Sequence, residues 1–317
     1  IPPGTKIEYY YSIRYTYGKE VRTPLNSILY LDNRFDWHTT EIGPITLYWH
    51  DQSETRVQKV ADQARQSIAR AGSILGVSPS RSINGIIYNS FPEAIQAFPD
   101  HSATLSAERI FQGFAFKNQR VFIGVGLHPN LIVHEAAHFL IGDAIDSPKA
   151  YIPKWVNEGF ASYVEPDRAA TLRSSDGALP LRSMSTLPGH PDDIGPFYAK
   201  AASVIEHLIE SYGNAQFQSF TAALNRGTRV NTALLSTYGF GIDALDLQWQ
   251  EHIVAEPEVT RRSKDLSPWI FLERTFLGFL ILAVMAMILG KLLYKLLVKR
   301  EDGLGGLDNY PNDPFNG

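Results

Sequence analysis

The sequence contains no cysteine, and this absence excludes several kinds of scaffold and site. A chain without thiols has no disulfides, no thiolate metal site and no cysteine nucleophile, so any metal ion must be bound by His, Asp or Glu. A strong excess of one charge is also absent. The 29 Lys and Arg against 33 Asp and Glu give a net charge of -4, which argues against nucleic acid as a partner.

The remaining composition is that of a folded protein. The 24 Gly and 19 Pro follow no period, and aromatic residues reach 12%, which excludes collagen-like, coiled-coil and wholly disordered chains. A length of 317 residues allows one large domain or two modest ones. Because residue 1 is Ile rather than an initiator Met, we expect a processed chain or a fragment.

The N-terminal segment is typical of β-structure. Residues 5–49 contain β-branched and aromatic residues in alternation, beginning with IEYYYSIRYTYG. Two or three such strands are too few for a stable sandwich. Residues 1–35 resemble the closing strands of an immunoglobulin-like module whose opening strands would lie upstream. A binding module of the adhesion type is therefore one functional alternative, on fold analogy alone.

Residues 36–255 show strands followed by helices, which predicts an α+β domain. After a strand at 45–49, apolar residues recur every three to four positions over 51–76, and Asp51 and Glu54 have capping-box spacing. Two more strands are expected at 83–89 and 119–125, with a short helix at 92–98 between them. The pattern is almost entirely helical from 130 to about 250.

The C-terminal segment changes character. After a linker at 256–268, we predict a transmembrane helix at 269–298, because 275–290 carry no charge and lysines follow at 291, 295 and 299. The basic end favours a cytoplasmic tail at 299–317, disordered by its composition. The preceding domain would then lie outside the cytoplasm, anchored in the lipid bilayer of a bacterial cell, with membrane proteins as possible partners. A buried core helix is the alternative interpretation of this segment.

The most informative motif is LIVHEAAHFLI, at residues 131–141. His134 and His138 are four residues apart, so on a helix both imidazoles can reach one metal ion. Glu135 is placed to take a proton from a water molecule that the metal activates. The alternative is a buried helix that happens to contain two histidines.

A third ligand is available in the segment WVNEGFA, where Glu158 follows His138 by twenty residues. Gly and Pro between them allow the chain to reverse direction and bring a second helix beside the first. HExxH followed after about twenty residues by NEGFA resembles the gluzincin metallopeptidases, which include aminopeptidase N and the peptidase MA-like enzymes. The resemblance implies that His134, His138 and Glu158 bind one zinc ion and that Glu135 is the general base.

A second match begins at Tyr198, in YAKAASVIEHLIESYG. It is similar to a gluzincin helix that opens with tyrosine, and the resemblance implies that the Tyr198 phenol donates a hydrogen bond to the oxyanion. The alternative is a core helix with Tyr198 at its solvated end. The resemblance covers roughly residues 36–255.

The sequence also departs from this family. Aminopeptidase N relatives bind the free amine of the substrate with a GxMEN strand. The corresponding segment of this sequence, FIGVGLHPN, has no acid. This departure favours an endopeptidase, with strand 120–125 pairing with an extended peptide. Ser162 stands where thermolysin-like enzymes have an Asp that orients a histidine, which leaves that role to Asp143, Asp146 or Glu165. His128 is interpreted as a loop histidine.

The sequence as a whole predicts a membrane-anchored zinc metallopeptidase that hydrolyses peptide or protein substrates. The main alternative is a catalytically silent subunit or scaffold of a membrane complex that keeps the same fold. An accessible cleft at the metal, with Tyr198 near it, would favour the enzyme.

Overall fold

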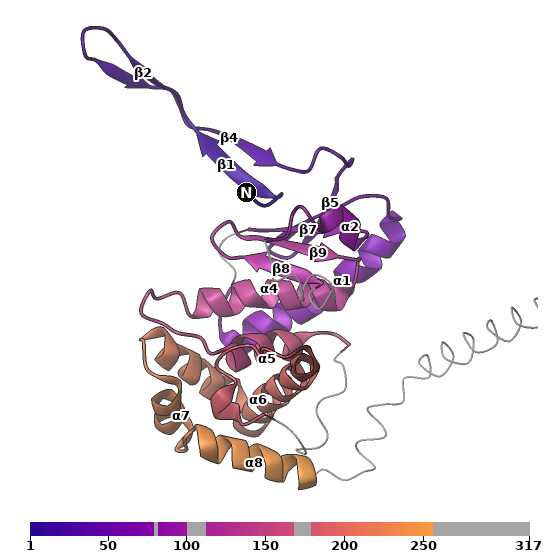
Figure 1. Ribbon diagram of the computed structural model, residues 1–317, viewed down its shortest axis with the longest axis vertical. Coiled ribbons are helices and arrows are strands. Elements are labelled where there is room, and N and C mark those ends of the chain that lie inside the picture. The colour runs from indigo at the N-terminus through magenta and orange to yellow at the C-terminus, as the bar shows by residue number, and fades with distance from the viewer. Residues whose placement is uncertain (79–81, 100–111, 168–178, 256–317) are drawn as a thin grey trace, which may run out of the picture. The chain divides into compact units, whose positions relative to one another are not determined.

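The computed structural model describes residues 1–78, 82–99, 112–167 and 179–255 (Figure 1). The predicted linker at 256–268, membrane helix at 269–298 and tail at 299–317 lie outside these residues. Within the described part of the chain, no helix combines the length and the apolar character that crossing a bilayer requires.

The centre of the molecule is a five-stranded sheet in the order β5-β6-β7-β9-β8. Its three inner strands are parallel, and the two outer strands are antiparallel to their neighbours. The strands are β5 (His38–Ile42), β6 (Ile45–Trp49), β7 (Ile83–Tyr88), β8 (Gly113–Phe116) and β9 (Val121–Val125). The α+β prediction is therefore correct for a small sheet and a helical half, although the sheet is mixed rather than purely antiparallel.

One face of the sheet packs on helices, which continue into an all-helical half (Figure 1). The apolar side chains of Leu47, Ile87 and Phe122 join α1 and α4 in one buried core. The helices are α1 (Glu54–Leu75), α2 (Phe91–Ala94), α4 (Pro129–Ala144), α5 (Lys154–Val164), α6 (Ile194–Asn225), α7 (Val230–Tyr238) and α8 (Ile242–Ala255), with 3-10 turns η1 (Leu181–Ser183) and η2 (Pro191–Asp193). Gly213 interrupts α6 with a φ of 83°.

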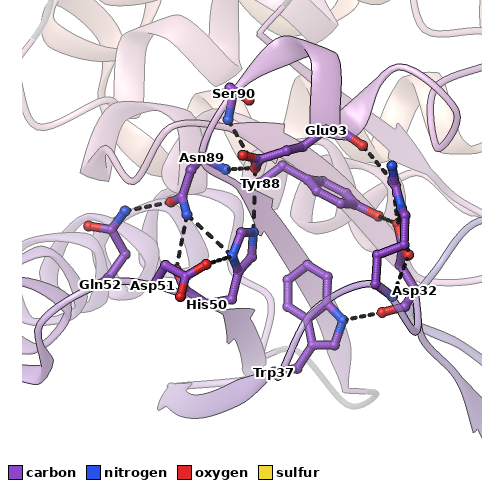
Figure 2. A network of polar contacts seen from close by, with 10 residues as sticks. Asp32, Trp37, His50, Asp51, Gln52, Tyr88, Asn89, Ser90 and Glu93 are labelled. Carbon is purple, nitrogen blue, oxygen red and sulfur yellow. Dashed lines mark hydrogen bonds and ion pairs between the residues drawn. The ribbon is translucent and has the colours of Figure 1, made fainter.

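The other face of the sheet is covered by α2 and by the segment that precedes β5. Tyr88 donates a hydrogen bond to Asp32 (3.1 Å), and the Trp37 indole donates to the Asp32 carbonyl (2.8 Å), as Figure 2 shows. The buried imidazole of His50 lies 2.9 Å from Asp51 and stacks on Phe35. These contacts attach the N-terminal segment to the ends of the central strands.

The first thirty residues form a long antiparallel ribbon (Figure 1). Strand β1 (Thr5–Tyr9) pairs with β4 (Asn26–Tyr30), and β2 (Ser12–Arg14) pairs with β3 (Glu20–Arg22). Most of its large apolar and aromatic side chains are exposed. Each pair is two-stranded, and the assignment of 1–35 to the end of an immunoglobulin-like module stays a prediction.

The start of α1 differs from the prediction. The helix begins at Glu54 with Ser53 as its N-cap, and no side chain caps it, because Asp51 instead contacts His50. A capping box does form between Ser90 and Glu93 at the start of α2. The spacing of Asp51 and Glu54 was therefore a wrong signal for a cap.

Candidate metal centre

Helix α4 places both histidines of the HExxH motif at one position in space. Pro129 occupies its first turn, and residues 131–133 and 135–141 are buried, as expected for a helix between a sheet and a helical layer. The four-residue spacing brings the rings of His134 and His138 to a centroid distance of 5.0 Å.

Helix α5 brings Glu158 to the same point. Its Oε2 lies 3.6 Å from Nε2 of His134 and 3.5 Å from Nε2 of His138, and these three atoms are all within 4.8 Å of one another. Ligands about 2.0 to 2.2 Å from a tetrahedral zinc ion lie roughly 3.3 to 3.6 Å apart, so the donor set and its spacing fit zinc.

The closeness of α5 to α6 depends on Gly159. A Cβ at this position would lie 2.5 Å from the carbonyl oxygen of Ala201 on α6. Glycine is therefore required for the helix packing that supports Glu158, and it is the third residue of the NEGFA segment.

Further contacts fix the orientation of His134 and Glu158. Glu165, the first residue after α5, contacts Nδ1 of His134 at 2.8 Å, which directs Nε2 toward Glu158. The other oxygen of Glu158 accepts hydrogen bonds from Lys154 (3.1 Å) and Asn157 (3.4 Å). The sequence left Asp143, Asp146 or Glu165 to orient a histidine. Glu165 makes this contact, whereas Asp143 is paired with Arg120 at 2.6 Å and Asp146 is exposed.

The protonation of these groups follows from their surroundings. Burial opposes the charging of His134, but hydrogen bonds to Glu158 and Glu165 raise its pKa to about 10. Burial lowers the pKa of His138 to about 4. Burial also opposes the ionisation of Glu158, yet His134, His138 and Lys154 hold the pKa of this carboxyl well below its usual range. The site therefore contains a carboxylate and a neutral imidazole before any metal binds.

Glu135 lies on the same helix and faces strand β8. It is 5% exposed, and burial raises its pKa to about 7. A Cβ on Gly113 would collide with the Glu135 carboxyl group and would lie 2.7 Å from Leu131. The missing side chain at position 113 thus makes room for the Glu135 carboxylate.

Tyr198 lies in the first turns of α6 and approaches the same centre. Its ring centroid is 6.2 Å from that of His134. Burial and the nearby carboxylates of Glu158 and Glu135 raise the pKa of its phenol, which therefore keeps its proton. Tyr198 lines a pocket of about 310 Å³ together with Glu135, His134, His138 and Glu158. The pocket is the accessible cleft that distinguishes an enzyme from an occluded scaffold.

The strand beside this pocket is not the one that the sequence indicated. Strand β9, which covers most of 120–125, pairs with β7 on one side and β8 on the other, so it has no free edge for a peptide. Strand β8 is the outer strand at the end of the sheet away from β5, and its residues Gly113, Phe114 and Ala115 line the pocket. The role given to 120–125 was therefore wrong.

Strand β8 was not predicted, because GFAF is short and no strong turn signal precedes it. Three residues that line the pocket were also not predicted, namely Lys117, Lys154 and Asn157. Their positions relative to the known motifs offered a signal for Lys154 and Asn157 alone, since both lie within one helical turn of Glu158. His128 occupies the N-cap position of α4 without a side-chain capping hydrogen bond, and it is not among the residues that line the pocket.

Residues 63–255 match the family model of the Peptidase MA superfamily. Because this match covers more than half of the 317 residues, the chain belongs to that superfamily. A comparison with curated proteins gives no significant match.

The comparison with solved structures gives matches of low similarity. An M1 zinc metallopeptidase from Deinococcus radiodurans is 15% identical, with a TM-score of 0.39, over 80% of this chain and 63% of that chain. A two-domain M1 zinc metallopeptidase mutant bound to L-arginine is 13% identical, with a TM-score of 0.45, over 78% of this chain and 60% of that one. The chain thus spans less than two thirds of the length of these structures.

Proposed function

We propose that this protein is a zinc-dependent peptidase, with zinc held by His134, His138 and Glu158. The observation that carries the proposal is the convergence of two imidazole nitrogens and one carboxylate oxygen within 4.8 Å, beside an open pocket. Because the chain lacks cysteine, metal ligands at this site can come only from histidine and carboxylate side chains. Bound there, zinc would polarise a peptide carbonyl and lower the pKa of water toward about 7.

Glu135 is the proposed general base and acid. Its pKa of about 7 suits a group that accepts a proton from water and then returns it to the leaving amine. Hydrolysis then adds OH to the carbonyl carbon and H to the amine nitrogen. The room left by Gly113 lets the carboxylate reach the pocket.

Tyr198 is the proposed oxyanion donor. Its phenol keeps its proton and lines the pocket near His134, so it can donate a hydrogen bond to the oxygen that becomes negative. An extended peptide would lie along the outer edge of β8, which the described residues leave without a partner strand. This arrangement supports cleavage within a peptide chain.

The test begins with metal content. Purified full-length chain is expected to hold one zinc per molecule and to cleave a peptide mixture, as followed by mass spectrometry. Glu135→Gln should keep its zinc and lose about 10²- to 10⁴-fold in kcat/KM. Glu251→Gln, an exposed change on α8, is the matched control. A chain that holds zinc but shows the same low activity with and without Glu135 would support a silent scaffold instead.

We also propose that residues 269–298 anchor the peptidase in a membrane, with its catalytic domain outside the cytoplasm. The support is the charge-free run 275–290 followed by lysines at 291, 295 and 299. Full-length chain should stay with membranes after an alkaline carbonate wash, whereas a chain ending at Ala255 should be released. Release of both would contradict the anchor.

A further inference from the structure

The pocket beside the proposed zinc site contains two lysines, and the two differ in their partners. Lys154 donates to Oε1 of Glu158 at 3.1 Å. This leaves the other carboxylate oxygen, Oε2, facing the two histidines. The ammonium group of Lys154 is therefore already paired with a proposed metal ligand.

Lys117 also lines the pocket, but no carboxylate of the described residues forms an ion pair with it. Lys117 is an exposed residue that lines the pocket, where partial desolvation, followed by repulsion from Lys154, lowers its pKa, while Glu158 opposes the change. Its positive charge is therefore solvated rather than neutralised in an ion pair with a carboxylate of the described residues. A cation in this state gains most from an anion that arrives with the substrate.

The position of Lys117 relates it to the path of a bound peptide. It is the first residue after β8, the outer strand beside the pocket. Lys117 begins the turn that joins β8 to β9, and it lines the same pocket as Gly113, Ala115 and Glu135. Gly113 and Lys117 are four residues apart, or about 13 Å along a strand. Lys117 therefore lies within a few substrate residues of the proposed base.

The carboxylates of the pocket argue against a substrate amine as the recognised group. Among its described lining residues only Glu135 and Glu158 are acidic, and the first is the proposed base and the second a proposed ligand. Neither is available to pair with a free α-amino group, and two lysines would repel one.

We propose that Lys117 selects peptides that carry a carboxylate within a few residues of the scissile bond. The carboxylate belongs either to an Asp or Glu side chain or to the C-terminus of the substrate. This inference rests on the proposed peptidase function and specifies its substrate class.

The test uses zinc-loaded full-length chain and one nine-residue peptide in which Glu or Gln is placed at each position in turn. Each peptide is made with a free C-terminal carboxylate and with an amide. Because a charge-assisted hydrogen bond contributes about 1.5 to 3 kcal/mol, kcat/KM should favour the acid over its neutral analogue by about 10-fold or more. A preference for Glu at one position identifies a side chain, and a preference for the free carboxylate identifies the C-terminus.

Lys117→Gln should remove this discrimination, and Lys117→Glu should reverse it in favour of Lys at the same substrate position. Lys59→Gln, an exposed change on α1, should leave it intact. A structural role of Lys117 would not produce the reversal. Equal cleavage of Glu and Gln peptides and of acid and amide forms would overturn the inference.

A second readout does not depend on turnover. Glu135→Gln loaded with zinc should bind the fluorescently labelled acidic peptide more tightly than the neutral one, and the Glu135→Gln/Lys117→Gln double variant should bind both alike. Failure of the wild-type chain to cleave any peptide contradicts the proposed function, whereas equal binding of the acidic and neutral peptides contradicts the role of Lys117.

Discussion

The carboxylate of Glu165 lies 2.8 Å from Nδ1 of His134, on the side of the ring opposite the atom that faces Glu158. An imidazole held in this way presents Nε2 in one orientation, and its basicity is increased. Glu165 is the residue that follows the last turn of α5, so the helix that provides Glu158 also orients His134.

Replacement of Glu165 should therefore weaken zinc binding without removing a ligand. Glu165→Gln is expected to lower zinc affinity by about 10- to 100-fold, measured by competition with a chelating dye. Asp146→Asn provides the control, since Asp146 is exposed at the end of α4 and was an alternative on sequence grounds. Unchanged affinity in Glu165→Gln would show that the contact does not support the metal.

Gly113→Ala should separate catalysis from metal binding. The new methyl group would occupy the space of the Glu135 carboxyl group, so kcat should fall by about 10-fold or more while zinc content stays at one per chain. Gly142→Ala on α4 meets no atom within 4 Å and is the matched control. Full activity in Gly113→Ala would mean that the base does not work from its observed position.

Zinc affinity should depend on pH through His134. Hydrogen bonds to Glu158 and Glu165 raise its pKa to about 10 against the opposing effect of burial, and this proton must leave before the ring binds metal. The apparent dissociation constant should then fall about tenfold per unit between pH 7 and pH 9. Burial already keeps His138 neutral there. Affinity that is flat with pH would contradict the protonated state of His134.

The same pKa shift predicts how the metal-free chain responds to pH. A histidine whose folded-state pKa is raised stabilises the fold below its ordinary value of 6.5, and this contribution is lost as pH rises toward about 10. The buried Glu135 acts in the same direction between its ordinary value of 4.5 and about 7. The melting temperature of chelator-treated protein should fall between pH 7 and pH 9, as measured by calorimetry, and a rise would contradict the assignment.

The buried pair of Lys200 and Asp246 should be important for the helical half. Lys200, 1% exposed, contacts Asp246 at 2.6 Å and the Leu179 carbonyl at 2.7 Å, which joins α6 to α8. Lys200→Met leaves the Asp246 carboxylate, whose side chain is 14% exposed, without its cation and should cost about 3 kcal/mol in urea unfolding. The double change with Asp246→Leu should restore much of the loss. The exposed pair of Arg182 and Asp243 serves as control, and Arg182→Gln should leave the urea midpoint unchanged.

The sequence predicted the centre of the site well because its residues lie on regular helices. His134 and His138 are one helical turn apart, so local spacing was sufficient to pair them, whereas Glu158 was selected through the resemblance of NEGFA to the gluzincin family. The orienting acid could be narrowed to three residues but not chosen, because Glu165 reaches His134 only through the packing of α5 on α4. The ligand role of these residues stays a prediction until metal is measured.

The sheet beside the site was harder to predict because strand order is a long-range property. Strand β9 follows β8 in the chain but lies inside it in the sheet, and nothing in either short segment indicates which one has the free edge. The place of Lys117 beside the pocket could not be predicted for the same reason. Its importance depends on the sheet edge, and an exposed lysine in a turn carries no signal of its own.

The ribbon of residues 5–30 has a practical consequence for anyone who purifies this domain. Within the described ranges no further strand pairs with either of its long sides, and Tyr11, Ile13 and Tyr17 are exposed along it. Such a ribbon is a template for strand addition by other chains, and its exposed apolar side chains favour self-association in concentrated solution. Light scattering of residues 1–255 should therefore show particle size growing with concentration, and deletion of residues 10–24 with a short Gly-Ser replacement should suppress that growth while leaving zinc content unchanged.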